Sequence, residues 1–128
     1  MDESVRILLI EDDEAIAELY RLRLTSDGYD VEVARDGEQG FRRALDGAPD
    51  LVYLDIRLPV SGGLDVLQRL RQEPRTRSLP VVILTNFDEP DLREMGVRLG
   101  ALEFLVKADT TPAQLSESTV RWLDDRLH

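Results

Sequence analysis

The sequence predicts a single α/β domain in which a parallel sheet of five strands alternates with five helices. Four short apolar runs have the length of strands buried on both faces, at 5–10, 51–54, 81–84 and 102–106. A fifth, shorter strand is expected at 31–34. The longer segments between the runs carry apolar residues at helical spacing, which is typical of a doubly wound sheet with right-handed crossovers. The 128 residues fit one such domain, spanning 1–128.

The first half of the chain contains two helices with clear end signals. We expect the first at 14–26, with Asp13 as its N-cap and Gly28 just beyond its end. Its inward face should comprise Ile16, Leu19, Tyr20 and Leu24. The second helix is expected to start after Asp36 and to end at Gly47. Its inward side chains should be Phe41, Ala44 and Leu45.

The second half of the chain contains three further helices. A loop at 57–63 leads into the third helix, whose inward side chains should be Leu64, Leu67 and Leu70. The next helix is expected to have Asp88 as its N-cap, with Pro90 in its first turn, and to bury Leu92, Met95 and Leu99. Because Gly96 in its interior costs about 1 kcal/mol relative to alanine, this helix should be the softest of the five. The last helix begins with a capping box formed by Thr111 and Gln114, and Pro112 is its first helical residue.

The composition excludes several classes of function. The chain has no cysteine, which removes disulfides, thiolate zinc sites and cysteine nucleophiles, and its one histidine is His128. A net charge of −10 argues against direct binding of nucleic acid. No apolar stretch approaches the roughly 20 residues of a membrane span, and the acidic first residues do not resemble a signal peptide. We therefore expect a cytoplasmic protein.

Polar residues follow four of the five predicted strands. Glu11, Asp12 and Asp13 follow the first, Asp55 the third, Thr85 the fourth and Lys107 the fifth. Lys107 is the single lysine of the chain, against fifteen arginines. Since the carboxyl ends of parallel strands open onto one edge of a sheet, these groups should meet in one crevice, where open α/β sheets bind their ligands.

These segments together resemble the receiver domain of bacterial response regulators, over nearly the whole chain. The matching motifs are the acidic residues of ILLIEDDE, the aspartate of YLDIRLPVSGG, the hydroxyl of VVILTN and the lysine of FLVK. None of these motifs is specific alone, but their combination in this order at strand ends is specific. The resemblance implies a flavodoxin-like fold with strand order 2-1-3-4-5.

The resemblance also implies a role for each strand-end residue. Asp55 would accept a phosphoryl group, which Thr85 and Lys107 would contact. Asp12, Asp13 and Asp55 would hold Mg²⁺, together with the backbone carbonyl of Arg57. Phe104 would be an aromatic switch that turns inward when the Thr85 hydroxyl is drawn toward the phosphate.

This assignment is chemically consistent. Three clustered carboxylates repel one another unless a divalent cation and Lys107 offset their charge. Mg²⁺ prefers oxygen ligands and retains waters, which suits a shallow site. Asp55 can then attack a phosphoryl group as a carboxylate nucleophile and form an aspartyl phosphate. Positioning and charge stabilisation supply most of the catalysis of such a transfer.

Three residues beside the site should set the lifetime of the phosphate. Arg57 and Phe87 lie two residues after Asp55 and Thr85, where the resemblance places side chains that flank the path of attacking water. Both are large, so we expect slow self-dephosphorylation. Asn86 stands where the family usually has a small residue, and its amide should crowd the site or hydrogen-bond to its ligands.

The expected function is therefore that of a phosphorylation-controlled switch in a two-component system or phosphorelay. A sensor histidine kinase or a histidine phosphotransfer protein would donate the phosphoryl group, and the domain would catalyse only its own phosphorylation and dephosphorylation. Its output would be a protein partner or a homodimer, bound through the fourth helix, fifth strand and fifth helix. Two alternatives remain open: the receiver part of a larger regulator with a DNA-binding or enzymatic output domain, and a non-phosphorylated docking domain of the same fold.

Two other classes of enzyme fit less well. A nucleotide-binding enzyme would have a glycine-rich phosphate loop after the first strand, where this chain has Glu11, Asp12 and Asp13. A phosphatase that forms an aspartyl phosphate typically has a second aspartate two residues after the nucleophile, where this chain has Arg57.

Overall fold

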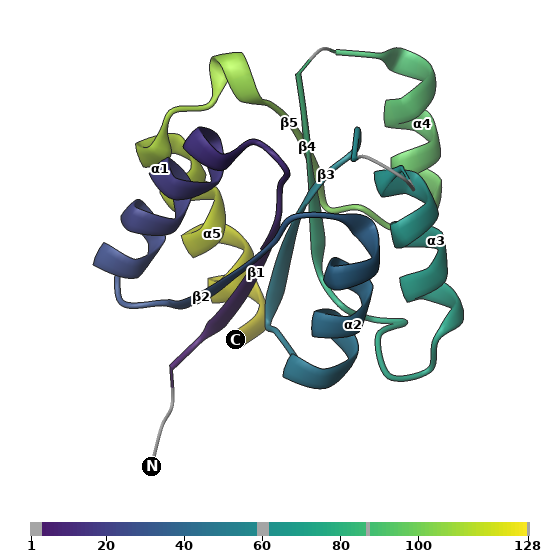
Figure 1. The fold of residues 1–128 in the computed structure, drawn as a ribbon, viewed down its shortest axis with the longest axis horizontal. Coiled ribbons are helices and arrows are strands. Elements are labelled where there is room, and N and C mark those ends of the chain that lie inside the picture. Colours follow the sequence, from purple (N-terminus) through teal and green to yellow (C-terminus); the bar gives the residue numbers. More distant parts are fainter. Residues whose placement is uncertain (1–3, 59–61, 87, 128) are drawn as a thin grey trace.

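A computed structural model of the chain describes residues 4–58, 62–86 and 88–127. Its centre is a parallel sheet of five strands in the order β2-β1-β3-β4-β5, as predicted. Strands and helices alternate along the described chain (Figure 1): β1 (Arg6–Ile10), α1 (Glu14–Ser26), β2 (Asp30–Ala34), α2 (Gly37–Gly47), β3 (Leu51–Asp55), α3 (Gly63–Gln72), β4 (Val81–Thr85), α4 (Pro90–Arg98), β5 (Glu103–Val106), the 3₁₀ turn η1 (Lys107–Asp109) and α5 (Pro112–Leu127).

The helices cover both faces of the sheet and divide its core in two. Figure 1 shows α1 and α5 on one face and α2, α3 and α4 on the other. Alternate strand residues supply the two cores, because successive side chains of a strand point to opposite faces. The α2–α3–α4 face receives Leu8, Ile10, Val52, Leu54, Val81 and Ile83. The α1–α5 face receives Ile7, Leu9, Leu51, Tyr53, Val82 and Leu84.

The helix starts show why these segments fold locally as they do. The Asp13 carboxylate accepts a hydrogen bond from the Ile16 backbone N–H at 3.1 Å, and so caps α1. At α5 the Thr111 hydroxyl accepts from the Gln114 N–H at 3.1 Å, while the Gln114 side chain accepts from the Thr111 N–H at 2.8 Å. Both predicted caps are thus confirmed, and each satisfies backbone donors that a helix leaves unpaired.

Two predicted core side chains and one predicted cap are wrong. Leu19 is 56% exposed and Met95 48% exposed. In α1, Ala17 takes the inner position beside Tyr20 and turns Leu19 outward. The N-cap position of α4 is occupied by Glu89 rather than by Asp88. Spacing misleads in α4 because this helix buries only Gly96 among its described residues, and its apolar side chains are at least partly exposed.

Gly96 has a packing role that helix propensity alone does not reveal. A Cβ atom at this position would lie 2.6 Å from Cδ1 of Ile83, which is fully buried in β4. Glycine therefore allows the backbone of α4 to approach the sheet closely.

Within the described part of the chain, no helix combines the length and apolar composition that a membrane span requires.

Candidate functional site

The carboxyl ends of four strands bring the predicted site residues together. Asp55 and Thr85 are the last residues of β3 and β4, and both are buried. In the sheet register Asp55 lies beside Leu84, and Thr85 beside Val106, the residue before Lys107. Glu11 directly follows β1 on the other side of β3. Residues 22 or more positions apart thus share one edge, as expected for a parallel sheet.

Lys107 is the cation of this edge. Its Nζ lies 3.0 Å from Oδ2 of Asp55 and 2.5 Å from Oε1 of Glu11, and its side chain is only 6% exposed. Burial alone would lower the pKa of Lys107, but the contacts with Glu11 and Asp55 outweigh it and raise the pKa above 10.5. The ammonium is therefore held in its charged form between two buried carboxylates.

The second oxygen of Asp55 is fixed by the loop that follows β3. Oδ1 accepts a hydrogen bond from the backbone N–H of Arg57 at 2.9 Å. Helix α3 begins directly against this turn, because the Gly63 N–H donates to the carbonyl of Ile56 at 2.9 Å. A Cβ atom at Gly63 would lie 2.2 Å from the carbonyl oxygen of Asp55, so only glycine permits this approach. The Asp55 carboxylate is thus oriented by the Arg57 N–H on one oxygen and by Lys107 on the other.

Glu11 is a full member of the site, although the sequence-based metal assignment named Asp12, Asp13, Asp55 and Arg57 and left it out. Its side chain is completely buried, and its Oε2 accepts a hydrogen bond from the Asp13 N–H at 3.1 Å. Burial raises the pKa of Glu11 to about 7, although the contact with Lys107 and the Asp13 N–H act in the opposite direction. The nearby Asp55 carboxylate raises this pKa further. The site thus holds more carboxylate than Lys107 alone can neutralise.

Three carboxylates are placed to share a cation. One oxygen from each of Glu11, Asp12 and Asp55 lies within 4.8 Å of the others, and Asp12 is on the solvent side. Asp13, which was predicted to be a metal ligand, lies outside this cluster and caps α1 instead. A set of hard oxygen donors with an excess of negative charge and one exposed member suits Mg²⁺, which retains several waters.

The comparisons with known proteins agree with this geometry. The profile of the response regulator receiver domain matches residues 7–118. The chain belongs to this family. Its acidic pocket of Glu11, Asp12 and Asp55 is typical of a phospho-aspartate site.

Individual relatives of this receiver domain include transcriptional regulators. The chain is 36% identical to the phosphate regulon transcriptional regulatory protein PhoB of Rhizobium meliloti, over 84% of this chain and 47% of PhoB. It is 42% identical to the DNA-binding dual master transcriptional regulator RpaA of Synechocystis, over 80% of this chain and 42% of RpaA. The chain therefore spans less than half the length of these two relatives.

A solved structure gives a neighbour with metal. The receiver domain of the sensor histidine kinase PA1611 from Pseudomonas aeruginosa superposes with a TM-score of 0.85 at 30% identity, covering 94% of this chain and 98% of that one. That structure holds a magnesium ion in its active-site cleft. Receiver domains interact with histidine kinases, which places this chain in two-component signalling.

The remaining predicted residues of the receiver domain lie at different distances from the pocket. Phe104 is partly buried against the α2–α3–α4 core, with the Arg93 guanidinium 5.3 Å from the centre of its ring. Asn86 is exposed directly after Thr85. Phe87 lies outside the described residues. The Arg57 side chain pairs with Glu89, a contact that no sequence signal predicted.

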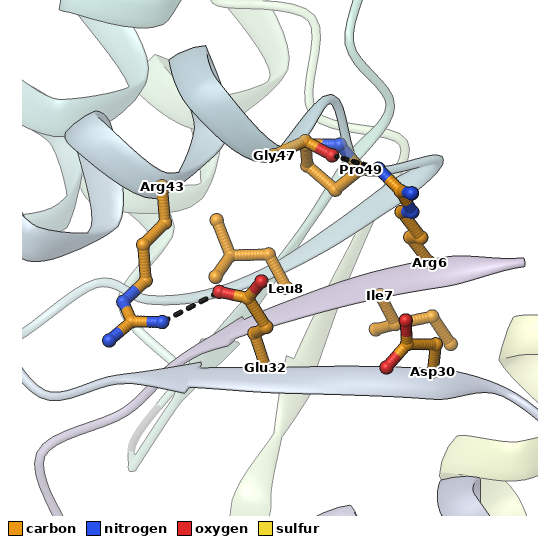
Figure 2. A pocket seen from close by; sticks show the side chains of 8 residues that line it. All are labelled: Arg6, Ile7, Leu8, Asp30, Glu32, Arg43, Gly47 and Pro49. Carbon is orange, nitrogen blue, oxygen red and sulfur yellow. Dashed lines mark hydrogen bonds and ion pairs between the residues drawn. The ribbon is translucent and has the colours of Figure 1, made fainter.

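A separate cavity lies at the opposite ends of the strands. It measures about 230 Å³, and residues from the amino-terminal halves of β1 and β2 and from the end of α2 line it (Figure 2). Three of its charged residues are engaged locally, because Arg43 pairs with Glu32 at 2.6 Å and Arg6 donates to the carbonyl of Gly47 at 3.0 Å. The acidic pocket is thus the site that the fold itself assembles at the carboxyl ends.

Proposed function

We propose that this receiver domain accepts a phosphoryl group from a phosphohistidine onto Asp55. The observation that carries the proposal is the environment of the Asp55 carboxylate, which ends the central strand β3 and contacts Lys107 at 3.0 Å and the Arg57 N–H at 2.9 Å. A carboxylate held by two fixed donors is oriented for reaction, and orientation supplies much of the catalysis of phosphoryl transfer.

The transfer needs little further chemistry from the protein. An oxygen of the Asp55 carboxylate attacks phosphorus while the bond from phosphorus to the donor imidazole nitrogen breaks, and an acyl phosphate forms. A carboxylate has no proton to lose, so the attack requires no general base. Lys107 neutralises charge beside the new group, and the buried Thr85 supplies a hydroxyl at the adjacent strand end. The domain acts on its own side chain and turns over no other substrate.

Magnesium is the cofactor that this donor set favours. Glu11, Asp12 and Asp55 would hold it, with the backbone carbonyl of Arg57 as a further ligand. When bound, Mg²⁺ would offset the negative charge of the carboxylates and of the incoming phosphoryl oxygens. The magnesium ion in the PA1611 receiver domain supports this assignment.

Labelling by a small-molecule donor tests the acceptor. Incubation with acetyl phosphate and Mg²⁺ should add a single phosphoryl group, seen by mass spectrometry of the intact protein. Borohydride reduction converts an aspartyl phosphate to homoserine and should do so at residue 55 only. Asp55→Asn should remain unlabelled, whereas Asp109→Asn, which changes an exposed aspartate of η1, should label normally. Labelling of Asp55→Asn, or no labelling of the wild type, would contradict the assignment and favour a docking domain.

Phosphorylation should act on other proteins through the α4–β5–α5 face. Thr85 and Phe104 lie on β4 and β5, next to α4. A Thr85 hydroxyl drawn to the phosphate would allow Phe104 to turn inward and change this face. A sensor histidine kinase or histidine phosphotransfer protein would supply the phosphoryl group in the cytoplasm. The phosphorylated domain would bind a downstream protein partner or a second copy of itself. Arg57, Asn86 and Phe87 would keep hydrolysis of the aspartyl phosphate slow.

A further inference from the structure

Arg57 connects the acceptor carboxylate to the start of α4. Its backbone N–H donates to Oδ1 of Asp55 at 2.9 Å. Its guanidinium donates from Nε to Oε1 of Glu89 at 3.0 Å, and Nη2 makes a second contact with the same oxygen. Glu89 directly precedes Pro90, the first residue of α4. One residue therefore bridges the acceptor loop, which we define as residues 56–58 after Asp55, and a helix 32 positions further along the chain.

The Glu89 carboxylate is committed to this bridge rather than to its own helix. Glu89 occupies the N-cap position of α4, but its side chain makes no cap hydrogen bond. By contrast, Asp13 and Asp36 at the N-caps of α1 and α2 both accept from a backbone N–H of the first turn. The Arg57 side chain is 56% exposed and that of Glu89 29% exposed, so solvent screens their attraction. Such a pair is weak enough to be exchanged for a stronger one.

A phosphoryl group on Asp55 would be that stronger partner. It would bring a charge of about −1.5 to −2 and three acceptor oxygens next to the Arg57 backbone. A guanidinium binds phosphate oxygens with two parallel hydrogen bonds, and these charge-assisted bonds are stronger than those of an exposed ion pair. The Asp55 charge already reaches the guanidinium, because Glu89 foremost and Asp55 to a lesser degree raise the pKa of Arg57.

We propose that the Arg57–Glu89 ion pair is a tether that holds the first turn of α4 to the acceptor loop, and that phosphorylation of Asp55 releases it by drawing the guanidinium to the phosphoryl group. Glu89 is then a positioning residue, because it acts on the site through Arg57. The inference rests on the proposed phosphorylation of Asp55 and adds to it a second route from the acceptor to α4, independent of Thr85 and Phe104.

Competition for one guanidinium has a measurable consequence. In the unphosphorylated domain Glu89 must be displaced before Arg57 can contact the phosphoryl group. Removing the Glu89 charge removes this competitor, so the domain should bind a phosphoryl analogue more tightly. The expected gain is about two- to fivefold, which corresponds to the strength of an exposed ion pair. The gain must vanish when Arg57 is absent.

Titration with beryllofluoride and Mg²⁺, followed by calorimetry, tests the tether. Glu89→Gln should tighten binding about two- to fivefold. In an Arg57→Ala background the same substitution should change nothing. Glu94→Gln is the matched control, because it removes the same carboxylate from an exposed ion pair of α4 with Arg98, 2.6 Å long, that does not reach the acceptor loop. It should bind as the wild type does.

The outcomes separate the tether from the proposed function. An unchanged affinity in Glu89→Gln, or an equal effect of that substitution with and without Arg57, would overturn the tether while leaving Asp55 as the acceptor. A wild type that binds no beryllofluoride in the presence of Mg²⁺ would overturn the proposed phosphorylation, and the tether with it.

Discussion

Neighbouring carboxylates of this receiver domain perform different tasks because the chain changes direction between them. Glu11 extends the line of β1 and is fully buried against Lys107. Asp13, two residues later, caps α1. Asp12 lies between them, exposed but still within reach of Asp55. One residue of register along this turn therefore decides whether a carboxylate pairs with a lysine, faces the proposed metal site or begins a helix.

The metal assignment makes a prediction at this scale. Asp12→Asn should weaken Mg²⁺ binding by roughly tenfold, because it removes one charged ligand; with Mg²⁺ in large excess, this lowers the Mg²⁺-induced stabilisation by about 1.4 kcal/mol. Asp13→Asn is the control, since asparagine also caps helices and Asp13 lies outside the cluster. Thermal melts with Mg²⁺ and with EDTA would measure both. If the two variants lost equal amounts of the Mg²⁺-induced stabilisation, Asp13 would be a metal ligand as well.

The lowered pKa of Glu103 predicts that the stability of the domain depends on pH. Partial burial alone would raise the pKa of Glu103, but hydrogen bonds from Trp122, Ser118 and Arg121 outweigh it and hold the pKa below 4.5. A carboxyl with a lowered folded-state pKa stabilises the fold above its unfolded-state pKa, and this contribution is lost as the pH falls through the folded-state value. The loss of stability in Glu103→Gln should therefore be full at pH 7 and should shrink below about pH 4.5.

Urea unfolding followed by the fluorescence of Trp122 would measure this difference. The indole N–H donates to Oε1 of Glu103 at 2.8 Å, so the reporter lies at the probed contact. Comparing the variant with the wild type at each pH cancels the titration of the other carboxylates. A difference in stability that stays constant down to about pH 3 would show that Glu103 does not titrate differently in the folded state.

At the scale of elements, α4 is fitted to the sheet by one glycine. Helix propensity predicts that Gly96→Ala stabilises the domain by about 1 kcal/mol. The new Cβ would lie 2.6 Å from Cδ1 of Ile83, and overpacking a buried site costs about 1–3 kcal/mol. We therefore expect net destabilisation in the wild type. In Ile83→Val, which removes that methyl group, the alanine should be neutral or stabilising.

Denaturant unfolding of the two single variants and the double variant would measure this coupling. An alanine that has the same effect in both backgrounds would mean that the Ile83 side chain moves aside at no cost. In that case Gly96 would serve the flexibility of α4 rather than its packing.

Local signals in the sequence predicted the elements better than their faces. The caps at Asp13 and Thr111 depend on neighbours within a few residues, so they could be found without the fold. Leu19 and Met95 were placed inward by spacing alone, yet which face of a helix meets the sheet depends on distant strands. The pocket residues Asp55 and Lys107 could be brought together because parallel strands end at one edge. The role of Glu11 could not be separated from that of Asp13, because it depends on which way each side chain points in the turn after β1.

At the scale of the whole molecule, the side of the sheet that should respond to phosphorylation is less enclosed than the centre of the sheet. All four residues of β5 are only partly buried, whereas β3 and β4 are buried throughout. Helix α4 buries only Gly96 among its described residues. Displacing these elements disturbs few buried contacts, so differential binding of a phosphoryl group can shift their equilibrium.

Amide exchange would locate this response. Adding beryllofluoride with Mg²⁺ should produce the largest changes remote from the pocket between Asp88 and Phe104, because we propose that the Thr85 hydroxyl and the Arg57 side chain both act on this segment. Asp55→Asn provides the control and should show none of them. Changes confined to the loops around Asp12 and Asp55 would mean that the α4–β5–α5 face is not the output.

The isolation of Lys107 gives the site a chemical label of its own. Its ε-amino group is the single one in the 128 residues, and only 6% of its side chain is exposed. Reductive methylation keeps the charge of a lysine, so ¹³C-methyl groups introduced this way would give one side-chain NMR signal that reports the electrostatics between Glu11 and Asp55. Since the buried amine can react only when the pocket opens, the rate of methylation would count those openings, and bound ligands would slow it.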